Sequence, residues 1–163
     1  MGKTTYQFED FLNDVNNDYQ GFVKDVHELL LQDNYKIKIE AKASGLMVSY
    51  SHPKTKRTIL NFVFRKKGLL VRIYADHCNN YADVLNRLPE RIVRQIEKVG
   101  ICKRLIDSQS CNSKCAMGYD FHIGENHYQK CRYNCFLLEV DFESIPFLLE
   151  LIERESKERK ADA

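Results

Sequence analysis

The sequence predicts an α+β domain in which helices cover an antiparallel sheet. Three observations support this fold class. Apolar residues recur with helical spacing near both ends of the chain, segments between residues 36 and 74 alternate with a period of two, and short polar or glycine turns join those segments. The chain has 163 residues, 44% of them hydrophobic and 29% charged, which is typical of one folded unit. Residues 1–163 are therefore expected to form a single domain that includes a Cys-rich segment at 102–135.

The expected helices follow from apolar periodicity and from capping residues. From Phe8 to Leu30, apolar residues recur at spacings of three and four, which indicates an amphipathic helix with candidate breaks at Asn16-Asn17 and Gly21. Three further helices are expected at residues 79–88, at 89–100, and from about residue 144 onward, where the last should fray into Lys/Glu-rich sequence.

The expected strands lie between these helices. Four segments show strand-like patterning and are joined by short turns, at residues 36–40, 46–50, 58–65 and 69–74. Gly68 ends the turn Lys66-Lys67-Gly68, and a glycine can take the positive φ that a tight hairpin requires. Four successive strands with short turns predict an antiparallel meander. A second hairpin is expected from residues 118–123 and 128–140.

Five of the six cysteines lie between residues 102 and 135, and four of these form two pairs with three intervening residues. Zinc favours four tetrahedral ligands, and two local pairs brought together can supply four thiolates. The predicted zinc ligands are Cys111, Cys115, Cys131 and Cys135, with Cys102 as a substitute ligand. An iron–sulfur cluster also uses four thiolates and is the second choice of cofactor.

The zinc hypothesis depends on the local backbone between Cys131 and Cys135. Residues i and i+4 on a regular strand lie about 13 Å apart and cannot share a metal. In that case Cys102, His122 or His127 would have to replace a thiolate. Three other interpretations stay open: a redox sensor or thiol enzyme that uses a Cys pair, a disulfide framework, and an interaction protein with inert buried cysteines.

Four segments carry a resemblance to a known family: 102–105 (CKRL), 111–115 (CNSKC), 118–119 (GY) and 130–136 (KCRYNCF). They resemble a family of uncharacterised small bacterial proteins with a Cys-rich C-terminal half, and the similarity runs along most of the chain. The resemblance implies a bacterial, cytosolic origin. It implies no activity.

A basic stretch suggests an anionic partner. Residues 42–75 contain eight Lys and Arg residues and no Asp or Glu. One face of the predicted sheet would combine basic side chains with an aromatic ring, an arrangement that can hold phosphates and stack a base. The predicted anion or nucleic-acid site consists of Arg65, Lys66, Lys67, Arg72 and Tyr74. The alternative is a solvated sheet face on which the hairpin lysines guard against aggregation.

No glycine-rich phosphate loop, nucleophile elbow or HExxH motif occurs, so the sequence gives no catalytic signature and leaves enzymatic activity open. Asp76-His77-Cys78 invites interpretation as a Cys/His pair, but adjacent residues on an extended chain point to opposite faces, which favours a turn. The N-terminal residues lack a signal-like apolar segment, and no stretch has the length of a membrane helix. We therefore expect a cytoplasmic protein that does not bind membranes: a zinc-stabilised binding module with a basic sheet face.

Overall fold

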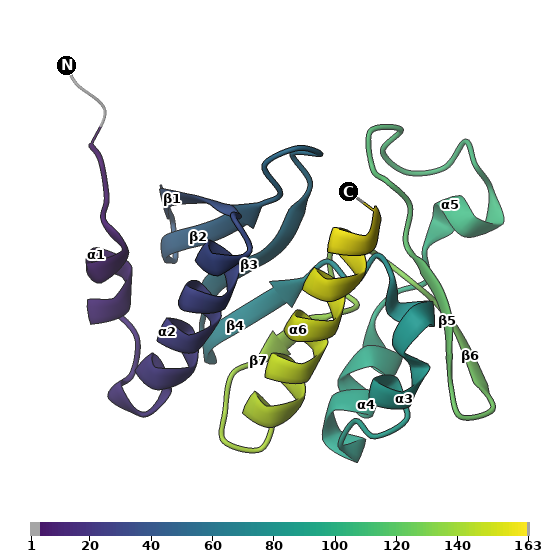
Figure 1. Ribbon diagram of the computed structural model, residues 1–163. Helices are drawn as coiled ribbons and strands as arrows, with labels where there is room; N and C mark the ends of the chain where they lie inside the picture. Colours follow the sequence, from purple (N-terminus) through teal and green to yellow (C-terminus); the bar gives the residue numbers. More distant parts are fainter. Residues whose placement is uncertain (1–3, 163) are drawn as a thin grey trace.

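The computed structural model describes residues 4–162 and confirms the α+β class (Figure 1). Its main sheet has five antiparallel strands in the order β1-β2-β3-β4-β7, and a separate hairpin joins β5 to β6. The strands are β1 (Lys36–Lys42), β2 (Gly45–Ser51), β3 (Thr58–Arg65), β4 (Gly68–Ile73), β5 (Tyr119–Ile123), β6 (Asn126–Lys130) and β7 (Leu137–Glu139). The helices are α1 (Phe8–Asn13), α2 (Asn17–Gln32), the 3-10 turn η1 (Cys78–Tyr81), α3 (Ala82–Leu85), α4 (Glu90–Lys98), α5 (Lys103–Ile106) and α6 (Ile145–Asp162).

The four-stranded meander forms as predicted, and β7 adds a fifth strand at its edge. The segment expected as one strand over residues 128–140 is instead divided by a turn at 132–136. Its first part, β6, pairs with β5, whereas its last part, β7, pairs with β4. This turn therefore brings the Cys-rich segment back to the main sheet.

The first amphipathic stretch confirms the candidate break at Asn16-Asn17 but not the one at Gly21, and the last helix differs from the prediction at its end. The first amphipathic stretch breaks at residues 14–16, because Asn16 caps α2 by accepting the backbone N–H of Asp18 at 2.9 Å, and the helix runs through Gly21. The expected fraying of the last helix is wrong, since α6 continues to Asp162. Glu155 and Arg159 hold this part in place because their side chains are buried and paired.

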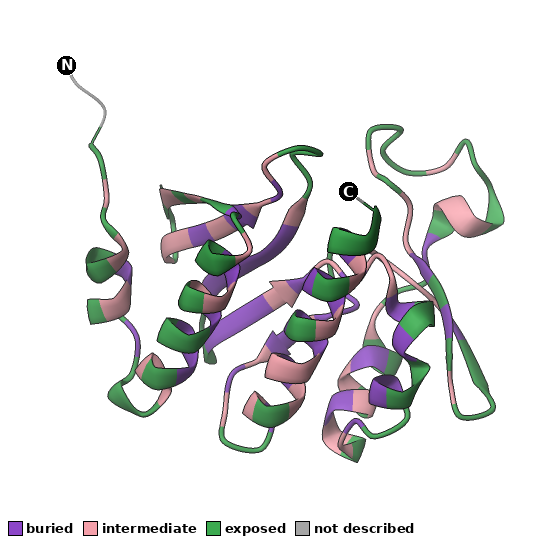
Figure 2. Ribbon diagram, in the orientation of Figure 1, coloured by how far each residue is buried: buried purple, intermediate pink, exposed green. Residues whose placement is uncertain are grey.

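The core lies between one face of the main sheet and helices α2 and α6, which cross that face side by side (Figures 1 and 2). Side chains of alternating strand residues point into it, as the period of two predicts. Its fully buried members include Val26, Leu30, Val48, Tyr50, Leu60, Phe62, Val71, Ile73, Leu148, Leu151 and Ile152. Full burial of one such aliphatic side chain contributes about 1.5–3 kcal/mol, so this interface fixes how α6 lies on the sheet.

The opposite face of the sheet carries a polar row, as the alternation predicts. Asn61 lies across from Ser49 on one side and from Arg72 on the other. The Asn61 amide donates to Ser49 Oγ at 2.7 Å, and Arg72 Nη1 donates to Asn61 Oδ1 at 3.4 Å. The row orients Arg72 toward the turn at 132–136, where its Nε donates to the Tyr133 carbonyl at 2.8 Å.

Candidate anion-binding site

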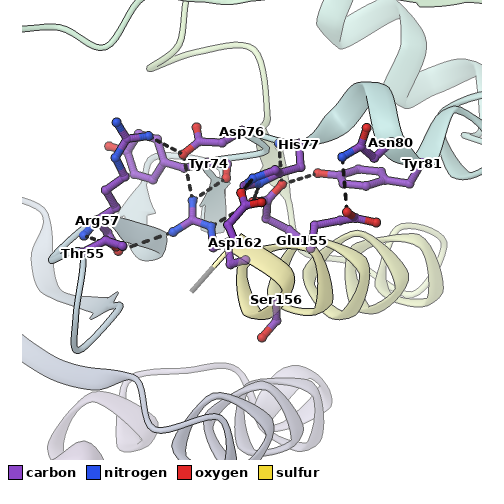
Figure 3. Close-up of polar contacts among 12 residues, drawn as sticks. Thr55, Arg57, Tyr74, Asp76, His77, Asn80, Tyr81, Glu155, Ser156 and Asp162 are labelled. Atoms are coloured by element: carbon purple, nitrogen blue, oxygen red, sulfur yellow. Dashed lines mark hydrogen bonds and ion pairs between the residues drawn. The ribbon is translucent and has the colours of Figure 1, made fainter.

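Charged side chains from three separate parts of the chain meet beyond the end of β4. Asp76 and His77 follow β4, Glu155 lies on the buried side of α6, and Tyr81 ends η1 (Figure 3). Arg132, in the turn after β6, supplies a further cation. Because the core packing fixes α6 against the sheet, these groups are held at short range.

Glu155 is the centre of this cluster. Its side chain has no exposed surface, and its two oxygens accept four hydrogen bonds. The donors are the backbone N–H of His77 at 2.9 Å, His77 Nδ1 at 2.8 Å, the Tyr81 hydroxyl at 2.8 Å and Arg159 Nε at 2.8 Å. A buried carboxylate is tolerated only when it is paired and hydrogen-bonded in this way. Burial and the adjacent Glu155 carboxylate raise the pKa of Tyr81, so its phenol remains a donor.

His77 links Glu155 to the last turn of α6. Its Nδ1 bonds to Glu155 and its Nε2 to the carboxylate of Asp162. Burial alone would lower the pKa of His77, but the hydrogen bonds to these two carboxylates outweigh it and raise the pKa above its usual value. The imidazolium thus ties the segment after β4 to the C-terminal turn of the helix.

Asp76 contacts three arginines of the cluster. It accepts a hydrogen bond from Arg132 and another from Arg159 Nη2 at 3.2 Å, while Arg57 Nη1 lies 3.8 Å from its carboxylate. The Arg132 guanidinium also stacks 4.9 Å from the ring centroid of Tyr74. Burial disfavours its charge, but the contact with Asp76 outweighs that effect and raises the pKa of Arg132. Arg132 is therefore a fixed cation, oriented by an acid and an aromatic ring.

On the outer side of this cluster lies a cleft of about 210 Å³, which we call the cationic cleft. Its walls are Arg57, Thr58, Tyr74, Lys114, Cys115, Ala116, Arg132 and Tyr133. Three of these residues are cations and none is an acid. Asp76 faces Arg132 from behind, but Lys114 forms no ion pair with any residue at positions 4–162. The walls therefore carry an excess of positive charge.

A second cavity of about 400 Å³ adjoins the cationic cleft and shares Arg57 with it. Its walls are His52, Thr55, Arg57, Asp76, His77, Arg159 and Asp162. Two acids face its cations, so the walls have no excess charge comparable to that of the cationic cleft. The cationic cleft is consequently the better candidate for an anion.

The structure brings only part of the predicted basic site to this cleft. Tyr74 lines it, and Arg72 approaches its rim through the bond to Tyr133. The other three residues, Arg65, Lys66 and Lys67, lie in or beside the turn between β3 and β4, at the opposite end of the strands. The 6 residues of β4 separate the two ends of the strands by about 20 Å. Lys67 pairs there with Glu139 at 3.4 Å.

The structure describes all four predicted zinc ligands and does not gather them into one group. Cys135 donates its backbone N–H to the Cys131 carbonyl at 2.9 Å, so the chain between them is a turn, as the zinc hypothesis requires. The Cys135 side chain is 1% exposed and belongs to the core, and burial raises the pKa of its thiol. Cys111 is exposed and Cys115 lies in the wall of the cleft. Within residues 4–162, no three His, Cys, Asp or Glu side chains form a group suited to a metal ion.

The remaining cysteines have local structural roles, and all six are free thiols. Cys102 is buried, and its Sγ accepts the backbone N–H of Gly118 at 3.2 Å. A Cβ at position 118 would lie 2.2 Å from the Lys130 carbonyl oxygen, so this close approach requires glycine. Burial, followed by the Glu155 charge, raises the pKa of Cys78 to about 12. Since His77 bonds to Glu155, the pair His77-Cys78 is not an activated nucleophile.

Sequence reasoning missed the buried polar side chains of α6 that organise the site. Glu155, Ser156 and Arg159 continue the apolar stripe of α6 at helical spacing, so they occupy positions where the periodicity predicts buried residues. Polar residues in such positions indicate a buried, paired network. The sequence contained that signal, but it did not indicate which residues outside α6 would pair with these side chains.

The described residues include no helix that is long and apolar enough to cross a membrane. No protein-family model, curated protein or solved structure matches the chain.

Proposed function

We propose that this protein is a binding module for an anionic partner, and that single-stranded nucleic acid is the class of partner that suits its cationic cleft best. One observation carries the proposal: the walls of the cleft combine Arg57, Lys114 and Arg132 with two tyrosines and contain no carboxylate. Guanidinium groups bind phosphate oxygens in a fixed, bidentate geometry.

The size of the cleft supports a chain-like ligand. Sites that enclose a drug-sized molecule have volumes of about 300–1,000 Å³. A cleft of about 210 Å³ can hold a phosphate group, but the rest of the partner would have to lie outside it. The polar row continues from the rim of the cleft through Arg72 to Asn61.

Tyr133 supplies a surface for a base. Tyr133 is 50% exposed at the rim of the cleft, and the Arg72 guanidinium lies 5.9 Å from the centroid of its ring. Stacking of a base on such an aromatic side chain contributes about 1–3 kcal/mol and tolerates any sequence. The proposal therefore predicts phosphate-dominated binding with little sequence preference.

The test is the binding of a fluorescent single-stranded RNA oligonucleotide, measured by anisotropy at several salt concentrations. Arg57→Ala combined with Lys114→Ala removes two exposed cations of the cleft. If each contacts one phosphate, the slope of log K against log salt should fall by about 1.4, because each contact on a single strand contributes about 0.7. Tyr133→Ala should weaken binding about 10-fold without changing the slope.

The matched control is Lys24→Ala with Lys157→Ala, which removes the same charge from exposed positions on α2 and α6. It should keep the native slope. If both double variants weaken binding equally, the attraction depends on net charge and the cleft is not the site. Absence of binding by the native protein at low salt would exclude nucleic acid as the partner.

The zinc part of the sequence hypothesis stays a prediction. The turn at Cys131 and Cys135 is compatible with it, and the four thiols differ in exposure, from the exposed Cys111 to the buried Cys135. Elemental analysis of protein purified without chelators tests it when the native chain is compared with Cys111→Ser combined with Cys115→Ser, because zinc held by the cysteines would be lost from the variant.

A further inference from the structure

Two histidines face each other on the solvent side of the β5–β6 hairpin. His122 pairs with His127 across the hairpin, with ring centroids 4.6 Å apart and ring planes inclined by 12°. Both residues are exposed, and the hairpin lies at the edge of the molecule (Figure 1). The two imidazoles are therefore close together and accessible without any change in the core.

An acid fixes the orientation of one of these rings. Asp120, two residues before His122 on the same face of β5, accepts a hydrogen bond from His127 Nε2 at 2.5 Å. Its other oxygen accepts from Gln129 Nε2 at 3.1 Å. Since His127 Nε2 carries the proton of this bond, Nδ1 of a neutral His127 is left with a free lone pair.

We propose that His122 and His127 together bind one divalent transition-metal ion of the Zn²⁺ or Cu²⁺ type. Imidazole nitrogens coordinate zinc at about 2.0–2.1 Å, so two nitrogens around one tetrahedral ion lie about 3.3 Å apart. Small rotations of two exposed side chains bring nitrogens of stacked rings to this separation. Water or another small ligand fills the remaining positions of the ion.

Asp120 acts in this site as a positioning residue. In metal sites, a ligating histidine almost always donates its other N–H to a carboxylate or a carbonyl, which fixes the ring and makes the ligand more basic. The hydrogen bond from His127 to Asp120 forms this arrangement before any ion arrives. It distinguishes the hairpin from a chance pair of surface histidines.

The site is independent of both the cationic cleft and the cysteines. None of its three residues lines the cleft, and no thiol takes part. The proposed site places the metal ion on the β5–β6 hairpin, which lies within the Cys-rich segment, and not on the cysteines. A bound ion would link β5 to β6 near the hairpin turn.

The experiment is a calorimetric titration of the full chain with Zn²⁺ alone, in a non-chelating buffer with a phosphine reductant. His122→Ala and His127→Ala should each weaken the affinity at least 10-fold. Cys111→Ser combined with Cys115→Ser is the control, because it removes two of the four predicted thiol ligands and should leave the affinity unchanged. Circular dichroism of the histidine variants should match the native spectrum, since both side chains are exposed.

Asp120→Ala should weaken binding about 10-fold, and Asp120→Asn, which keeps a hydrogen-bond acceptor, should recover part of that loss. The proposal is overturned if the native chain shows no Zn²⁺ affinity tighter than about 1 mM. It is also overturned if the histidine variants bind like the native chain, or if only the cysteine variant loses the ion.

Discussion

Replacement of Glu155 by glutamine should destabilise the protein by about 3–4 kcal/mol. The amide oxygen can still accept from the His77 backbone and from Tyr81, but its NH₂ group would face two charged donors, His77 Nδ1 and Arg159 Nε. Two charge-assisted hydrogen bonds contribute about 1.5–3 kcal/mol each. Removal of one partner of a buried ion pair costs about 3–5 kcal/mol.

For Glu155→Gln we expect the lower part of the range of about 3–5 kcal/mol, because Arg159 keeps other hydrogen-bond partners. Its Nη2 still donates to the Tyr74 carbonyl at 2.9 Å and to Asp76 at 3.2 Å. The guanidinium is therefore not left without an acceptor. In a chain of this size, a loss of about 3–4 kcal/mol corresponds to a decrease in melting temperature of roughly 10 °C.

Urea unfolding followed by circular dichroism measures this difference. Glu153→Gln is the matched control, since it makes the same change at an exposed position of α6 and should alter the free energy of unfolding by less than about 0.5 kcal/mol. A Glu155→Gln loss below about 1 kcal/mol would refute the reasoning, because it would mean that the four hydrogen bonds do not form together.

Two further predictions concern His77 and the thiols. Because the folded-state pKa of His77 is raised above its usual 6.5, its stabilisation is complete below the unfolded value and is lost as pH rises through the folded value. The difference in unfolding free energy between the native chain and His77→Gln should thus be about 2 kcal/mol at pH 5.5 and smaller at pH 9. A difference that grows with pH would contradict a raised pKa of His77 in the folded state. In native-state alkylation followed by mass spectrometry, Cys111 and Cys115 should react within minutes, whereas the buried Cys78, Cys102 and Cys135 should react slowly with or without a chelator. Protection of all four predicted zinc ligands that a chelator abolishes would instead favour the metal site.

The elements of the fold could be predicted because each depends on residues close together in the sequence. The alternation from Thr58 to Arg65 and the glycine at position 68 specify a hairpin without reference to the rest of the chain. β7 could not be predicted in the same way. It has three residues, and its pairing with β4 depends on the turn at 132–136, which follows from tertiary packing.

The candidate site was only partly predictable for the same reason. Arg72 and Tyr74 share one face of the sheet, and strand alternation alone places them there. Glu155 meets His77 across 78 residues of sequence, a pairing that no local pattern encodes. Spacing also suggested that Cys131 and Cys135 act together, but the turn directs Cys135 into the core and leaves Arg132 and Tyr133 at the cleft.

The buried network behind the cationic cleft has a consequence for binding as well as for stability. A flexible surface arginine loses side-chain entropy when it binds a phosphate, at a cost of about 0.5–1.5 kcal/mol. Arg132 has already lost this freedom, because Asp76 and the rings of Tyr74 and Tyr119 hold its guanidinium. Asp76 in turn is held by Arg159, whose orientation depends on Glu155. Glu155→Gln should therefore weaken oligonucleotide binding under conditions where the variant is still folded, although Glu155 does not line the cleft. Native affinity in the folded variant would show that the network stabilises the protein without organising its binding site.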